Sequence, residues 1–207
     1  MSGNAAIVSV YMANIHFSVV AMQKAVVEQL APPDMPFHQL RVDRPHAESL
    51  DAFLNETDFD TVVVLDIDCI PLHGDALPML RDEAAKGQLV GAVQRANHIA
   101  NGGHLYAGPF CMAFTRDLWA RLGKPSFQGT VRGDVGEELT YRCEEEGVGV
   151  RMLWPTAVEE PLWPLRDGAV FGYGTEYESA FWHCFEIRDP RNQLRFTNRC
   201  FRALEGR

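Results

Sequence analysis

The stretch that most constrains the fold is TVVVLDID, residues 61–68. Its first five residues include no charged side chain, as in a central strand that is covered on both faces. Asp66 and Asp68 follow directly. A strand buried on both faces belongs in a sheet with helices on either side, so this stretch predicts an α/β protein.

Strand and helix patterns alternate along most of the chain, which predicts right-handed βαβ units and a mostly parallel central sheet flanked by helices. We expect one domain over residues 1–207, with a mixed C-terminal part. Residues 97–108 are expected to form a glycine-rich loop, and residues 171–189 to be irregular apart from a strand at 182–184. The remaining predicted strands are 5–12, 37–43, 61–68, 88–96 and 148–155, and the predicted helices are 16–30, 47–58, 74–87, 116–123 and 133–147.

Composition and charge exclude several classes of protein. The net charge of −9 argues against a general nucleic-acid binder, which would normally carry a basic field. The five cysteines are scattered and form no C-x-x-C pair, so neither a disulfide framework nor a zinc knuckle is expected. We find no signal peptide and no stretch that approaches the roughly 20 apolar residues of a transmembrane helix. These features favour a cytoplasmic protein with no transmembrane segment.

The C-terminal segment 188–207 departs from the acidic average, because it has six arginines and two acidic residues. Two interpretations remain open for it. The segment could be a solvated tail, or it could be a basic segment that meets phosphate.

The two aspartates suggest a metal site. Alternating strand side chains would point Asp66 and Asp68 to the same side, and two nearby carboxylates repel each other unless a cation lies between them. Mg²⁺ or Mn²⁺ suits such oxygen ligands and keeps positions open for the phosphates of a substrate. An alternative is that Asp68 only caps the turn before Pro71. Another is a haloacid-dehalogenase-like phosphotransferase with Asp66 as nucleophile, although that motif stands on the first strand and ends in Thr or Val rather than Ile70.

Several stretches in this order resemble the GT-A-fold, DxD-containing glycosyltransferases, which use nucleotide-sugars. The resemblance covers most of the chain. It rests on FDTVVVLDIDCIPL (59–72), YAGPFCMAFTRDLWARLG (106–123), GDVGEELTYRCEEEGV (133–148) and FWHCFEIR (181–188). It implies a Rossmann-type GT-A-like sandwich with a nucleotide-binding half at about 1–72 and a sugar and acceptor half at about 73–207.

The resemblance also implies roles for individual residues. Asp68 would bind the metal directly, Asp66 would reach it through water or hold the ribose, and His183 would complete the site. Gly108 would lie beside the donor sugar. For the strand-end residues the alternative is ordinary turn chemistry. Those residues, expected to meet the base or the ribose, are Tyr11, Ala13, Asn14 and Asp43.

Asp134 is the candidate catalytic base. An inverting transferase needs a carboxylate that takes the proton of the acceptor hydroxyl. The alternative is that Asp134 caps the helix predicted at 133–147. The sequence has no adjacent Glu-Asp pair here, so both the base and the inverting assignment stay open.

The expected activity is metal-dependent transfer of a sugar from a UDP- or GDP-type donor. The acceptor is unknown and could be a glycan, a small molecule or modified DNA. The other alternative is a non-catalytic protein that binds nucleotide-sugars.

Overall fold

The computed structural model describes residues 4–99 and 103–206. Its strands are β1 (Ala5–Met12), β2 (Phe37–Val42), β3 (Thr61–Leu65), β4 (Cys69–Pro71), β5 (Leu89–Arg95), β6 (Leu105–Thr115), β7 (Val150–Leu153), β8 (Pro155–Pro164), β9 (Val170–Tyr177) and β10 (Phe181–Cys184). Its helices are α1 (Phe17–Leu30), α2 (His46–Glu56), α3 (Ala76–Ala84), α4 (Arg116–Arg121), α5 (Glu137–Glu145) and α6 (Pro190–Leu204).

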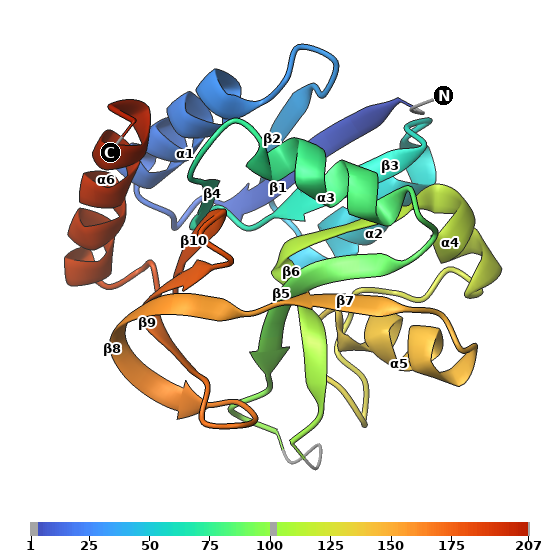
Figure 1. Ribbon diagram of the computed structural model, residues 1–207. Coiled ribbons are helices and arrows are strands. Elements are labelled where there is room, and N and C mark those ends of the chain that lie inside the picture. The colour runs from blue at the N-terminus through green and yellow to red at the C-terminus, as the bar shows by residue number, and fades with distance from the viewer. Residues whose placement is uncertain (1–3, 100–102, 207) are drawn as a thin grey trace.

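The central sheet has six strands in the order β2-β1-β3-β6-β5-β7 (Figure 1). The pairs β1–β2, β1–β3 and β5–β7 are parallel, and β6 runs antiparallel to both β3 and β5. The expected mostly parallel sheet is therefore confirmed. All five residues of β3 are buried, as expected for a strand with both faces covered.

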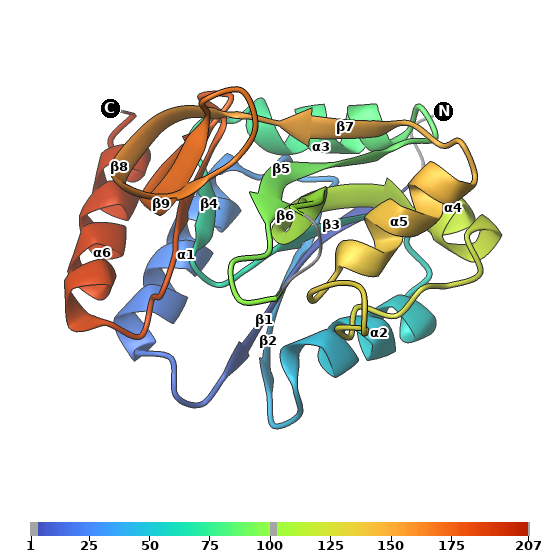
Figure 2. The same ribbon diagram turned by 90° about the horizontal axis from the view of Figure 1, so that it is seen from below.

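Helices cover both faces of this sheet (Figure 2). One face packs against α3 and part of α1, through residues such as Val27, Leu77 and Leu80. The other face packs against α2, α4 and α5. This layered core confirms the α/β sandwich, and it leaves the carboxyl end of β3 free to carry polar groups at the sheet edge.

A second sheet has four strands in the order β4-β10-β9-β8, with antiparallel pairing throughout. The prediction that residues 171–189 are mostly irregular is wrong, because Val170–Tyr177 pairs with a strand on each side. Gly172 explains the misinterpretation. A Cβ there would lie 2.1 Å from the carbonyl oxygen of Glu160, so this glycine permits close strand pairing rather than a loop.

Three further predictions need correction. Leu105–Thr115 is one long strand, so part of the predicted loop 97–108 belongs to β6, and residues 100–102 of that loop lie outside the described residues. Helix α5 begins at Glu137 rather than near residue 133, because Gly136 takes a left-handed φ of 75° and stands at the N-cap position. Asp134 is therefore not the helix cap.

The arginine-rich segment at the C-terminus is a helix rather than a solvated tail. Helix α6 buries one face, which includes Phe196 and Cys200, and lies beside α1 (Figure 1). Arg191 and Arg202 of this helix are exposed, whereas Arg195 and Arg199 are partly buried and form ion pairs with Glu159 and Glu160 of β8 and with Glu176 of β9. Over residues 4–99 and 103–206, no helix has both the length and the apolarity that crossing a bilayer requires.

Candidate functional site

The two aspartates lie in a turn between β3 and β4. Strand β3 ends at Leu65, and the Cys69 amide donates to the Asp66 carbonyl oxygen at 2.9 Å. The prediction that residues 61–68 form one continuous strand is wrong. The carboxylates therefore approach each other because the chain turns here, and not because side chains alternate along a strand.

Backbone hydrogen bonds from two distant strands hold this turn. The Asp66 amide donates to the Phe110 carbonyl oxygen of β6 at 2.9 Å, and the Cys184 amide of β10 donates to the Asp68 carbonyl oxygen at 3.0 Å. The turn thus joins the central sheet to the second sheet.

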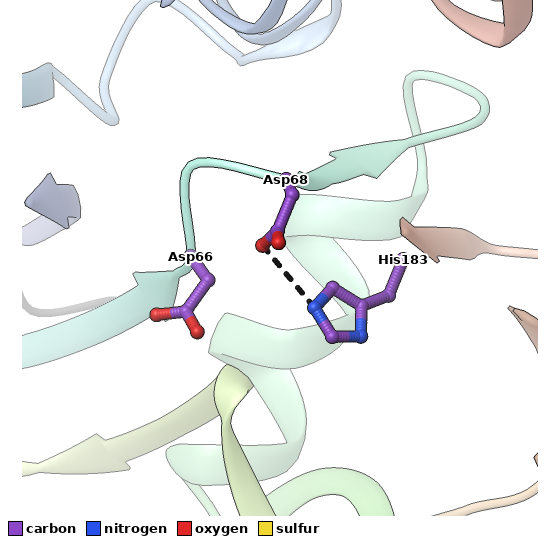
Figure 3. Close-up of side chains that lie close together, drawn as sticks. All are labelled: Asp66, Asp68 and His183. Carbon is purple, nitrogen blue, oxygen red and sulfur yellow. Dashed lines mark hydrogen bonds and ion pairs between the residues drawn. The ribbon is translucent and has the colours of Figure 1, made fainter. Parts of the chain in front are cut away.

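His183 reaches the aspartates because β10 pairs with β4, which places His183 opposite Cys69. Ligand atoms of Asp66, Asp68 and His183 all lie within 4.8 Å of one another (Figure 3). The His183 Nε2 atom lies 3.2 Å from Asp68 Oδ1. The imidazole stacks on the Phe110 ring, with centroids 4.1 Å apart, and meets the edge of Phe185. These ring contacts fix the plane of the histidine.

His46 is a fourth polar side chain at this site, and the sequence analysis missed it. Its Nε2 atom lies 2.8 Å from Asp66 Oδ1. Burial disfavours the charged form of each partner, but their mutual attraction prevails, so the pKa of His46 is raised and that of Asp66 is lowered. The sequence signal that could have identified His46 is its position at the start of the helix after the second strand, near the edge of the sheet where Asp66 and Asp68 lie.

The donor atoms fit a divalent cation. Two carboxylates and one imidazole combine the oxygen ligands that suit Mg²⁺ and Mn²⁺ with a nitrogen ligand that transition metals accept. Asp68 and His183 are only 8% and 4% exposed, so a cation there would be largely shielded from water. Without a cation, the two carboxylates repel each other at this separation, and only their contacts with His46 and His183 offset the repulsion.

A cavity of about 570 Å³ opens on one side of the aspartates, at the carboxyl ends of β1 and β2. Tyr11 lines it, and the predicted contact of Tyr11 with the base or the ribose stays a prediction. Ala13, Asn14 and Asp43 are exposed and do not line it, so their ligand contacts stay predictions. The lining residues are Val10, Tyr11, Met12, Ile15, Val42, His46, Asp66, Ile67, Asp68, Glu186, Ile187, Arg188 and Asp189.

A smaller cavity of about 250 Å³ lies on the other side of the aspartates. Its lining includes Asp66, Asp68 and His183 together with Asp134, and these residues come from three separate parts of the chain. Four residues line both cavities, and they are His46, Asp66, Asp68 and Glu186. The candidate metal site therefore stands at the junction of a larger and a smaller cavity.

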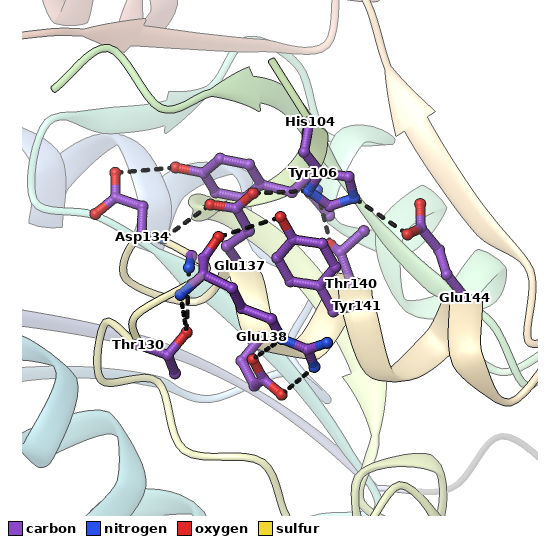
Figure 4. A network of polar contacts seen from close by, with 12 residues as sticks. His104, Tyr106, Thr130, Asp134, Glu137, Glu138, Thr140, Tyr141 and Glu144 are labelled. Carbon is purple, nitrogen blue, oxygen red and sulfur yellow. Dashed lines mark hydrogen bonds and ion pairs between the residues drawn. The ribbon is translucent and has the colours of Figure 1, made fainter. Parts of the chain in front are cut away.

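Asp134 is held by a network of polar contacts (Figure 4). The Tyr106 hydroxyl donates to its Oδ2 atom at 3.2 Å, and the Val135 amide donates to Oδ1 at 2.7 Å. Its own amide donates to the Glu137 carboxylate at 2.8 Å. Burial, and then the charge of Asp134, raise the pKa of Tyr106, so the phenol stays a hydrogen-bond donor. The carboxylate of Asp134 is thus oriented at the edge of the smaller cavity.

Gly108 lies in β6 and lines neither cavity. A Cβ at this position would lie 2.4 Å from a ring carbon of Phe110. The glycine therefore leaves room for the ring on which His183 stacks, and its predicted contact with the donor sugar stays a prediction.

No protein-family model and no curated protein sequence matches the chain. Among solved structures, it is similar to the mannosyltransferase PcManGT from Pyrobaculum calidifontis in complex with GDP-Man and Mn²⁺, with a TM-score of 0.54 and 13% identity. The match covers 83% of this chain and 57% of the mannosyltransferase, so the chain spans little more than half of that protein.

A second similar structure is Drosophila β-1,4-galactosyltransferase 7 in complex with manganese, UDP-Gal and xylobiose. Its TM-score is 0.45 at 14% identity, covering 81% of this chain and 70% of that one, which is too weak a likeness to support an argument. The fold rests on the mannosyltransferase match together with the observed topology. The chain therefore has the GT-A-like glycosyltransferase fold that its DxD stretch implied, with an Asp-Asp-His group at the end of the central strand.

Proposed function

We propose that this protein is a metal-dependent glycosyltransferase that takes its sugar from a nucleoside-diphosphate donor. The observation that carries the proposal is the convergence of Asp66, Asp68 and His183 at the junction of two cavities. In a sheet of this type, ligands bind beyond the carboxyl ends of the strands, where this group lies.

In this proposal Asp68 and His183 hold Mn²⁺ or Mg²⁺ directly, and Asp66 contacts it through water or binds the ribose. The cation, when bound, offsets the negative charge of the donor's diphosphate. His46 keeps the Asp66 carboxylate ionised and oriented. Imidazole as a ligand favours Mn²⁺ over Mg²⁺, because Mg²⁺ prefers oxygen ligands and water.

The larger cavity is the proposed donor side. Its volume suits a nucleotide, and its apolar residues with Tyr11 offer a surface for the base. Arg188 lines the same cavity and supplies a positive charge for phosphate. We propose a UDP- or GDP-type donor, and the GDP-Man complex of the similar mannosyltransferase supports the guanine form as the first to try. Most of this cavity comes from residues 1–72, and the segment 186–189 completes it.

The smaller cavity is the proposed acceptor side, with the half at 73–207 supplying most of its lining. Asp134 is the proposed base, because its carboxylate lines the cavity that also contains the candidate metal ligands. It would take the acceptor's proton while the sugar is attacked from the face opposite the diphosphate. The acceptor class remains a glycan, a small molecule or modified DNA.

Thermal-shift measurements with a panel of nucleotide-sugars, each with and without Mn²⁺, test the proposal. One donor should raise the melting temperature only when Mn²⁺ is present, since ligand binding to the folded state stabilises it. The same donor should then be hydrolysed slowly, or transferred when acceptors are added. Stabilisation without either reaction would indicate a non-catalytic binding protein. Hydrolysis of simple phosphate monoesters, with no response to nucleotide-sugars, would instead indicate a phosphotransferase.

A further inference from the structure

Gln23 is a buried amide within the apolar face of α1. Its exposed fraction is 0%, and its buried neighbours on the helix include Val19, Val26 and Val27. An amide that loses water without gaining hydrogen bonds destabilises the fold, so a glutamine at such a position is expected to have hydrogen-bond partners.

Those partners are at the aspartate turn. The Gln23 Nε2 group donates to the carbonyl oxygen of Asp66 at 2.5 Å and to that of Cys69 at 3.1 Å. Its Oε1 atom accepts a hydrogen bond from Gln39 Nε2 at 3.0 Å. Gln39 also donates to the Val20 carbonyl oxygen at 2.9 Å, which fixes the orientation of both amides.

The two carbonyl groups belong to the first and last residues of the turn. The Cys69 amide already closes this turn by donating to the Asp66 carbonyl oxygen at 2.9 Å. Gln23 therefore ties both ends of the turn to α1, an element that contributes no ligand of its own. The backbone of this turn determines where the Asp66 and Asp68 carboxylates lie relative to His183. The ligand atoms of the three residues lie within 4.8 Å of one another, so a small shift of the turn would separate them.

We propose that Gln23 is a positioning residue for the metal site. It touches neither substrate nor cation, and it acts by holding the backbone of residues 66–69 in the shape that brings the carboxylates together. The part of this inference that concerns the metal rests on the proposed function. The part that concerns the turn stands on the hydrogen bonds alone.

Gln23→Met tests the inference, because methionine keeps the length and flexibility of the side chain and removes its hydrogen bonds. We expect Mn²⁺ binding, measured by calorimetry on the folded protein, to weaken by about tenfold, the lower range for groups that support metal ligands from outside. We also expect faster hydrogen exchange of the Cys69 amide in the metal-free protein.

Two further variants serve as controls. Leu122→Ala removes a buried side chain from a different core cluster, so it should lower stability without changing exchange at Cys69 or Mn²⁺ affinity. Gln39→Met leaves the hydrogen bonds between Gln23 and the turn in place and removes only the hydrogen bond from Gln39 that orients the Gln23 amide. Mn²⁺ affinity and exchange at Cys69 should therefore change in the same direction as in Gln23→Met, but by less. If Gln23→Met does not fold, Gln39→Met decides, and unchanged Mn²⁺ affinity and exchange there would overturn the inference.

The outcomes separate this inference from the proposed function. If the unsubstituted chain binds Mn²⁺ and Gln23→Met binds it equally well, the positioning role is refuted and the proposed function stands. If the unsubstituted chain binds no Mn²⁺, the proposed function fails, and Cys69 exchange alone then decides whether Gln23 holds the turn.

Discussion

The two acidic regions of the site are held in different ways. The turn with Asp66 and Asp68 is anchored through its backbone, by hydrogen bonds to β6, β10 and α1. Asp134 stands in an irregular segment before α5, and its carboxylate is oriented by the Tyr106 hydroxyl and the Val135 amide.

This difference matches the roles that we propose. A metal ligand must keep its position within a few tenths of an ångström, and a backbone tied to three elements provides this. A base must approach each acceptor, so an oriented side chain on a loop is sufficient. The comparison predicts that changes at the turn affect metal and donor binding, whereas changes near Asp134 affect only transfer.

Asp68→Asn should have the largest effect. Losing the charge of this proposed direct ligand should lower donor turnover by about 10³-fold, because a bound metal contributes several kcal/mol of charge stabilisation. Donor hydrolysis over a range of Mn²⁺ concentrations measures this. Glu56→Gln, an exposed change at the end of α2, should leave turnover unchanged. Full metal-dependent turnover by Asp68→Asn would refute the metal assignment.

Asp134→Asn should come next. Transfer to an acceptor should fall by about 10²-fold, within the usual contribution of a general base, while Mn²⁺ and donor binding stay within twofold of the original. Single-turnover transfer and calorimetry measure the two quantities separately. Weaker Mn²⁺ binding in this variant would break the comparison, because it would couple the loop to the metal.

Tyr106→Phe should show a smaller effect of the same kind. The variant removes one hydrogen bond to a carboxylate, and at 3.2 Å this bond should be worth about 1.5 kcal/mol, the lower end for hydrogen bonds to charged groups, so transfer should fall by about tenfold. Donor hydrolysis in the absence of acceptor should not change. An equal fall in both reactions would indicate that the tyrosine supports the whole site rather than Asp134.

His46→Gln should produce the smallest effect, on the stability of the metal-free protein. Because the pKa of His46 is raised above its ordinary value of 6.5, protonated His46 stabilises the fold fully at pH values below 6.5. This contribution disappears as the pH rises through the pKa that His46 has in the folded protein. Because the pKa of Asp66 is lowered below its ordinary value of 3.8, ionised Asp66 stabilises the fold fully at pH values above 3.8. This contribution disappears as the pH falls through the pKa that Asp66 has in the folded protein.

The free energy of unfolding of the unsubstituted protein should therefore exceed that of His46→Gln near pH 5–6. We expect a difference of less than about 1 kcal/mol, because the pair of His46 and Asp66 is partly exposed. The difference should shrink at pH 8 and above. Denaturant unfolding at several pH values measures it, and a difference that grows with pH would show that the pair does not act as an ion pair.

Much of this molecule could be inferred from local patterns. The apolar run of β3 and the helical spacing of α1 and α2 predicted the layered fold, because periodicity reflects which face each element buries. The aspartate pair was found because charged groups at the end of a buried strand need a partner. The family resemblance added His183 and Asp134.

Other features depended on contacts between residues distant in the chain. Gln23 appeared as one polar residue in an apolar helix face, and only its contact with a turn 43 and 46 positions away gave it a role. His46 meets Asp66 only because α2 follows β2, which reaches the same sheet edge. Strand β9 was missed because its glycines resemble a loop until a partner strand lies against them.

The sequence thus predicted most elements of the central sheet and its covering helices, and which acids are unusual, since these depend on neighbours within a few residues. The tertiary structure decided that the carboxylates converge through a turn, that Asp134 is no helix cap, and that α6 packs on α1. These depend on strand pairing and helix packing over long sequence separations, where no local pattern specifies the partner.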